Sequence, residues 1–112
     1  MYLTAAAVNH VLADITRYVR QFTVSFDYVT EEVIAKTTGD PEIISVVERF
    51  AAMGAPWHYG ISDVRSLADK AMATILEHVK VADLHRAYWP NKQLDSPIYD
   101  YYSICTFQDV QQ

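Results

Sequence analysis

The chain has 112 residues, of which 51% are apolar and 21% are charged, and it contains only three glycines and four prolines. This composition is typical of one globular domain and excludes a disordered, fibrous or collagen-like chain. Fourteen acidic residues against nine basic ones give a formal net charge of −5, which disfavours general binding to the phosphate backbone of nucleic acids.

The cellular compartment is indicated by the single cysteine, Cys105. One cysteine cannot form an intramolecular disulfide, so a reducing compartment is favoured. The first ten residues lack the basic start and continuous apolar run of a signal peptide, and no apolar stretch reaches the about 20 residues of a membrane-spanning helix. We expect a cytoplasmic protein with no membrane partner.

The first predicted element is a helix over residues 5–21. Thr4 is suited to cap it, and apolar residues recur at three- and four-residue steps from Val8 to Phe22. In the next segment, 23–29, polar residues alternate with apolar or aromatic ones. This pattern predicts either a short strand or an extended connection.

The middle of the chain predicts two helices, over 31–38 and 41–53. Asp40-Pro41-Glu42 combines an N-cap acceptor, a proline at the first helical position and an acid at the positive end of the helix dipole. The segment 29–50 resembles a helix-turn-helix, in which small residues allow two helices to cross closely. The side chains that its second helix would expose are poor for insertion into DNA because two of them are acidic; they are Glu42, Ser45, Glu48 and Arg49.

The second half of the chain predicts one long amphipathic helix over 62–86, which Trp89-Pro90 would end. The tail offers two alternatives: a strand over 98–107 that pairs with 23–29, or a docking segment that orders on a partner. The predicted fold class is therefore mainly α, a four-helix single domain, with a two-stranded element formed by 23–29 and 98–107 left open. Residues 1–91 would form the helical core and 92–112 a tyrosine-rich acidic segment.

Aromatic residues gather in three clusters in the second half of the chain. Tyrosine and tryptophan are enriched where proteins meet partners. We therefore expect a partner-binding surface formed by Tyr99, Tyr101, Tyr102, Asp95, Asp100, Trp57, Tyr59 and Trp89. For the two tryptophans, closing the core at the ends of the long helix is an equally good interpretation.

The long helix also predicts a homodimer. Its aliphatic stripe contains small residues that would let a second copy approach closely. The expected interface residues are Leu67, Ala71 and Ile75.

Candidate catalytic and metal-binding groups are sparse. On one helix, His78 and His85 would lie about 10 Å apart, too far to share one metal ion. His10 and Asp14 are one turn apart, which indicates a surface contact. Cys105 has no base near it in sequence, and only the fold could bring His58 or His85 beside it. We expect no enzyme activity, no metal and no cofactor.

These observations predict a small acidic cytoplasmic protein–protein interaction module, homodimeric, that modulates a basic partner such as a nucleic-acid-binding protein. One alternative is a helix-turn-helix DNA-binding regulator that dimerises through the long helix. The other is a small-molecule-binding protein or enzyme with an aromatic pocket around Trp57, His58, Tyr59 and Trp89.

Overall fold

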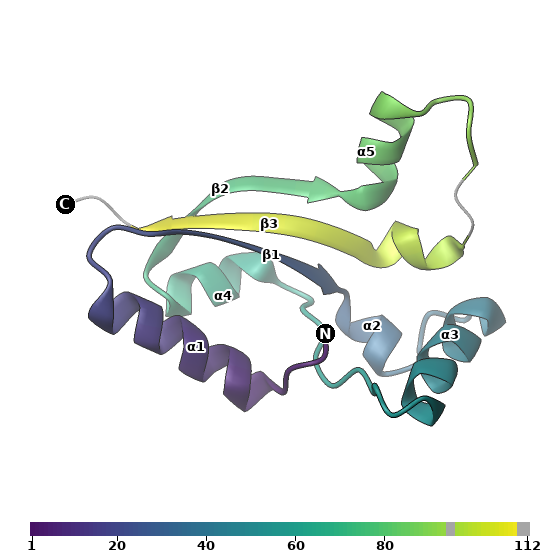
Figure 1. Cartoon of the computed structure of the whole chain (residues 1–112), viewed down its shortest axis with the longest axis horizontal. Helices are drawn as coiled ribbons and strands as arrows, with labels where there is room; N and C mark the ends of the chain where they lie inside the picture. Colours follow the sequence, from purple (N-terminus) through teal and green to yellow (C-terminus); the bar gives the residue numbers. More distant parts are fainter. Residues whose placement is uncertain (94–95, 110–112) are drawn as a thin grey trace.

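A computed structural model describes residues 1–93 and 96–109. Helices and strands are mixed along the described chain (Figure 1). The elements are α1 (Ala5–Tyr18), β1 (Thr23–Val29), α2 (Glu31–Ile34), α3 (Pro41–Ala52), α4 (Val64–Lys70), β2 (Ala73–Lys80), α5 (Val81–Tyr88), the 3-10 helix η1 (Pro97–Tyr101) and β3 (Tyr102–Asp109).

The three strands form one antiparallel sheet in the order β1-β3-β2. The last strand in the sequence therefore lies at the centre, and β1 and β2 form the edges (Figure 1). In the register, Phe107 lies opposite Val24 on one side and Ile75 on the other. Phe107 and Cys105 on β3 are fully buried, as expected for a strand that is paired along both edges.

The prediction of a mainly α four-helix domain is wrong, because the expected long helix over 62–86 is interrupted by a strand. Met72 adopts a left-handed backbone conformation with φ 52°, which ends α4, and Ala73–Lys80 then runs extended as β2. The four-residue spacing of Ile75 and Val79 fits the helical period. In β2 the two residues lie opposite Phe107 and Ile104, on different faces of the sheet, because an irregularity shifts the register between Ile75 and Glu77, so the strand has no strict alternation. The periodicity alone therefore did not distinguish the two structures.

The expected pairing of 23–29 with the C-terminal segment is present, but as half of a three-stranded sheet. Residues 98–101 belong to η1, and pairing begins at Tyr102. The segment that could have been a docking tail is thus the central strand.

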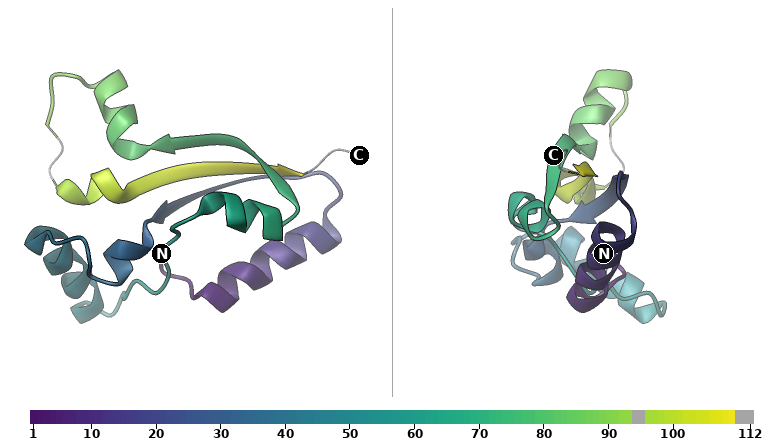
Figure 2. Two further views of the ribbon diagram at one scale, coloured as in Figure 1. Left: turned by 180° about the vertical axis from the view of Figure 1, so that it is seen from behind. Right: turned by 90° about the vertical axis from the view of Figure 1, so that its left-hand side faces the viewer.

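The helices cover one face of the sheet and one end of it. The views in Figures 1 and 2 place α1 and α4 on the same face, and α5 projects away from the body beyond the end of β2. A second apolar cluster lies at the end of the sheet around α2, α3 and η1; its buried members are Val29, Val33, Ile43, Val47, Trp57 and Ile98. The opposite face of the sheet carries exposed polar residues, including Ser25, Asp27 and Glu77.

Several local signals act as predicted. The Thr4 side chain accepts a hydrogen bond from the Ala7 N–H, and the Asp40 side chain accepts one from Glu42. Segment 29–50 contains two helices, α2 and α3, but α2 is only four residues long, half of the predicted 31–38. Among the described residues, no helix is long and apolar enough to cross a membrane.

Candidate binding groove

Helix α1 has an apolar stripe that the described part of the chain buries only in part: Val8 and Leu12 pack half-buried against the core. None of its 14 residues is buried, and Val11 in the middle of the stripe is 48% exposed. The helix is nevertheless held in place, because the Thr16 hydroxyl donates a hydrogen bond to Ala71 O at the end of α4 (3.0 Å). The stripe therefore faces the sheet without filling the space in front of it.

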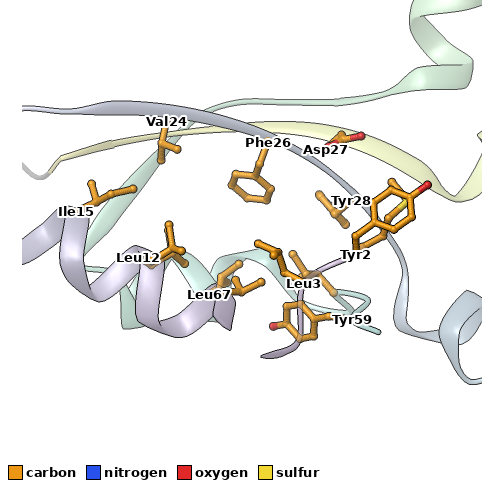
Figure 3. A pocket seen from close by; sticks show the side chains of 14 residues that line it. Tyr2, Leu3, Leu12, Ile15, Val24, Phe26, Asp27, Tyr28, Tyr59 and Leu67 are labelled. Carbon is orange, nitrogen blue, oxygen red and sulfur yellow. The ribbon is translucent and has the colours of Figure 1, made fainter. Parts of the chain in front are cut away.

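An apolar groove of about 320 Å³ lies between α1 and β1. Figure 3 shows side chains from the helix and the strand pointing into it from opposite sides. The groove is lined by Met1, Tyr2, Leu3, Val8, Val11, Leu12, Ile15, Val24, Phe26, Asp27, Tyr28, Tyr59, Ile61 and Leu67. Its volume is about twice that of a 150 Å³ apolar cavity that stays dry and binds benzene.

The strand side of the groove is formed by alternate residues of β1. Val24, Phe26 and Tyr28 share one face because side chains alternate along a strand. Phe26 packs edge-to-face on the buried Phe107 ring, with the ring centroids 5.0 Å apart. This contact anchors the wall of the groove in the core.

The N-terminal residues close one end of the groove. Met1 O accepts hydrogen bonds from the backbone N–H groups of His58 (2.8 Å) and Tyr59 (3.4 Å). Tyr2, Leu3 and Tyr59 all line the groove, and Figure 3 shows Leu3 near Tyr59.

Asp27 is the only charged residue of the lining, and it is engaged on the other face of the sheet. The Tyr102 hydroxyl donates a hydrogen bond to Asp27 Oδ2 (2.8 Å). Burial, and then the hydrogen bond with Asp27, raises the pKa of Tyr102 above its usual value. The groove thus offers a ligand apolar contact, with a carboxylate at its rim.

The fold also brings a histidine to Cys105, but neither of the two expected. His78 lies opposite Cys105 in the β2–β3 register, and its Nε2 is hydrogen-bonded to the Tyr28 hydroxyl (2.5 Å). Burial raises the pKa of the Cys105 thiol, so the thiol stays protonated at neutral pH. A protonated, fully buried thiol is a poor nucleophile.

The three tyrosines of the predicted partner surface are partly buried within the protein. Tyr99, Tyr101 and Tyr102 are half-buried and pack against the second apolar cluster. Asp100 is exposed, and Asp95 lies outside the described residues.

The remaining aromatic residues are distributed over three places. Trp57 is buried and stacks on Phe50, with the ring centroids 5.2 Å apart. Tyr59 lines the groove, whereas Trp89 is 58% exposed beside Tyr88 at the end of α5. The three residues have different aromatic or pocket neighbours: Trp57 is paired with Phe50, Trp89 with Tyr88 and His85, and Tyr59 lines the groove.

The three residues expected at a dimer interface do not lie together on an exposed helix face. Leu67 and Ala71 are buried in the core of the protein itself, and Ile75 is a half-buried residue of β2. The long helix whose face they would share is not present.

Within residues 1–93 and 96–109, no three histidine, cysteine or acidic side chains come together as a metal site. His10 and Asp14 do form the expected surface contact, with Nε2 and Oδ2 3.3 Å apart.

Comparison of the chain with protein-family models, with curated proteins and with solved structures finds no match. The assignment of the groove as a candidate binding site is therefore based on its geometry alone. The apolar stripe on α1 and the alternation in β1 are visible in the sequence, but the groove between them is not. A stripe of apolar residues shows that a helix face needs covering, and it does not show how completely the chain covers it.

Proposed function

We propose that this chain is a small acidic module that binds a partner protein, and that apolar side chains of the partner enter the groove between α1 and β1. The observation that carries the proposal is the partly exposed stripe of α1, with Val11 48% exposed, facing an apolar wall across the groove. Burial of apolar surface contributes about 25 cal/mol per Å², so a partner that fills this space gains binding energy from both walls.

The state of α1 supports the same proposal. An isolated helix of about 12–15 residues is marginal in water, and the 14 residues of α1 pack on the core only through half-buried side chains such as Val8 and Leu12. A ligand in the groove would add the packing that the helix lacks and would stabilise it.

The charge and the free cysteine support the other parts of the proposal. A net charge of −5 favours a basic partner, including a nucleic-acid-binding protein, over nucleic acid. The free, buried Cys105 is in keeping with the cytoplasm. We retain a homodimer as a prediction, and light scattering at micromolar concentration that gives the mass of one chain would contradict it.

The groove can be tested with the neutral fluorophore N-phenyl-1-naphthylamine, which becomes bright in apolar surroundings. We expect saturable binding to the wild-type chain and at least fivefold weaker binding to Val11→Gln, because an amide would lie against an apolar ligand. The matched control is Val19→Gln: Val19 is 43% exposed, close to the 48% of Val11, but does not line the groove.

The control should bind within twofold of the wild type. Circular dichroism of both variants establishes that the helix content is kept. Absence of saturable binding, or equal losses in the two variants, would contradict the proposed site.

A further inference from the structure

Strand β1 has a free edge along most of its length. Backbone groups along a strand point alternately to its two edges. Thr30 N–H donates to Tyr101 O on the β3 side, whereas Val29 O accepts from Ile61 N–H on the outer side. The backbone groups of the other odd-numbered residues therefore point outwards; these residues are Thr23, Ser25 and Asp27. No described residue forms a backbone hydrogen bond with these outward groups.

The groove lies directly below this free edge. Val24, Phe26 and Tyr28 point into it from β1, and α1 forms its opposite wall (Figure 3). A strand added beside β1 would continue the sheet over the groove. Every second side chain of that strand would then point into the apolar space, and the others would lie on the polar face beside Asp27.

The charges around the groove define the partner further. A second hollow shares Tyr59 and Ile61 with the groove, and its charged lining residues are Glu31, Asp63 and Lys70, so that acids outnumber bases there. None of the acids Asp27, Glu31 and Asp63 forms an ion pair with a described residue. Lysine or arginine side chains beside β1 would complement them, and opposite charges on neighbouring strands are stabilising.

Building on the proposed function, we propose that the partner presents an extended basic segment that joins the sheet as a fourth strand beside β1. Its apolar side chains enter the groove, and its alternating lysine or arginine side chains lie beside Asp27. The outward backbone groups of Thr23 and Ser25 provide affinity for any extended chain, and the groove and the carboxylates select its side chains.

The probe is the peptide acetyl-Lys-Val-Lys-Val-Lys-Val-Lys-amide, and its affinity is measured by calorimetry. Two further peptides are methylated on backbone nitrogens, one at every lysine and the other at every valine. Each modification removes the N–H donors along one edge of the extended peptide. Antiparallel addition directs the lysine amides towards β1, so we expect methylated lysines to weaken binding at least tenfold and methylated valines less than threefold. The reverse pattern indicates parallel addition and also supports a fourth strand, whereas equal effects of the two sets overturn it.

The charge requirement is tested with protein variants and with an acidic peptide. Replacing the lysines by glutamates should weaken binding at least tenfold. Asp27→Asn should weaken the lysine peptide about threefold to tenfold, and the control Glu77→Gln, on the opposite edge strand, should leave its affinity unchanged. Equal affinities for the two peptides would overturn the basic partner.

Amide hydrogen exchange supplies a readout independent of affinity. The amides of Thr23, Ser25 and Asp27 should exchange more slowly when the lysine peptide is bound. If these amides are already protected without peptide, and their exchange becomes slower still as the protein concentration is raised, a second copy of the chain occupies the edge. That result overturns the proposal. If N-phenyl-1-naphthylamine binds the groove but the lysine peptide does not, the added strand is refuted and the groove stands; if neither binds, both proposals fail.

Discussion

Removal of the Phe107 side chain tests whether the C-terminal segment is the centre of the core. The ring is fully buried, lies opposite Val24 and Ile75 in the sheet, and packs edge-to-face on Phe26. Replacing a buried phenylalanine by alanine costs about 3–5 kcal/mol. The ladder holds the flanking strands in place, so the cavity cannot collapse, and the aromatic pair adds about 0.5–1.5 kcal/mol. We therefore expect Phe107→Ala to lose about 4–5 kcal/mol of unfolding free energy.

The assay is urea unfolding followed by circular dichroism, with the free energy obtained by linear extrapolation. Tyr88→Ala is the control, because Tyr88 is 71% exposed and should change stability by less than about 0.5 kcal/mol. Phe107→Leu, which keeps part of the ring volume, should lose about 1–2 kcal/mol and gives a measurable transition if the alanine variant does not fold. A loss below about 1 kcal/mol for Phe107→Ala, or the same loss for Tyr88→Ala, would refute the central position of β3.

Three further predictions concern the groove, the Asp27–Tyr102 pair and the chain after α3. Val24→Ile adds one methylene group to the groove lining, so thermal unfolding should show a gain of up to about 0.8 kcal/mol while affinity for N-phenyl-1-naphthylamine falls; a gain without loss of affinity would contradict the groove. Because burial and Asp27 raise the pKa of Tyr102 from 10.0, the folded state holds the phenol proton more tightly than the unfolded chain. This contribution to stability is complete below pH 10 and is lost as the pH rises further. In urea unfolding at increasing alkaline pH, the unfolding free energy of Asp27→Asn should therefore fall less steeply with pH than that of the wild type. The same pH dependence in both proteins would contradict the prediction. A Cβ atom at Gly60 would lie 2.6 Å from Thr30 O, so Gly60→Ala should destabilise by about 1–3 kcal/mol in thermal unfolding, whereas the exposed Ser62→Ala should have almost no effect.

The parts of the fold that the sequence predicted are those specified by neighbouring residues. Thr4 and Asp40 each place a side-chain oxygen next to free helical N–H groups, so α1 and α3 begin where expected. Strand β2 was missed because Ala73–Lys80 contains good helix formers such as leucine, glutamate and lysine. Its extended state depends on pairing with β3, which starts 22 residues after β2 ends. Strand formation is governed by such context more than by intrinsic preference.

The candidate site was predictable in its parts and not in its assembly. The apolar positions of α1 and the alternation of β1 are visible as patterns in the sequence. The space between them depends on how far α4 and residues 1–3 hold α1 from the sheet, through contacts such as Thr16 with Ala71 and Met1 with His58. Those contacts join residues more than 50 positions apart, which no local pattern reports.

The order of strands in the sheet has a consequence for synthesis on the ribosome. Both neighbours of β3 precede it in the chain, and β1 begins 79 residues earlier, at Thr23 against Tyr102. At about 5–20 residues per second, β1 waits roughly 4–16 s before its partner has been translated. During that interval β1 lacks its β3 partner, and its unpaired backbone groups leave the nascent chain open to chaperones and to aggregation. The sheet closes only after translation of β3, so its folding is coupled to completion of the C-terminal segment rather than to the emergence of α1.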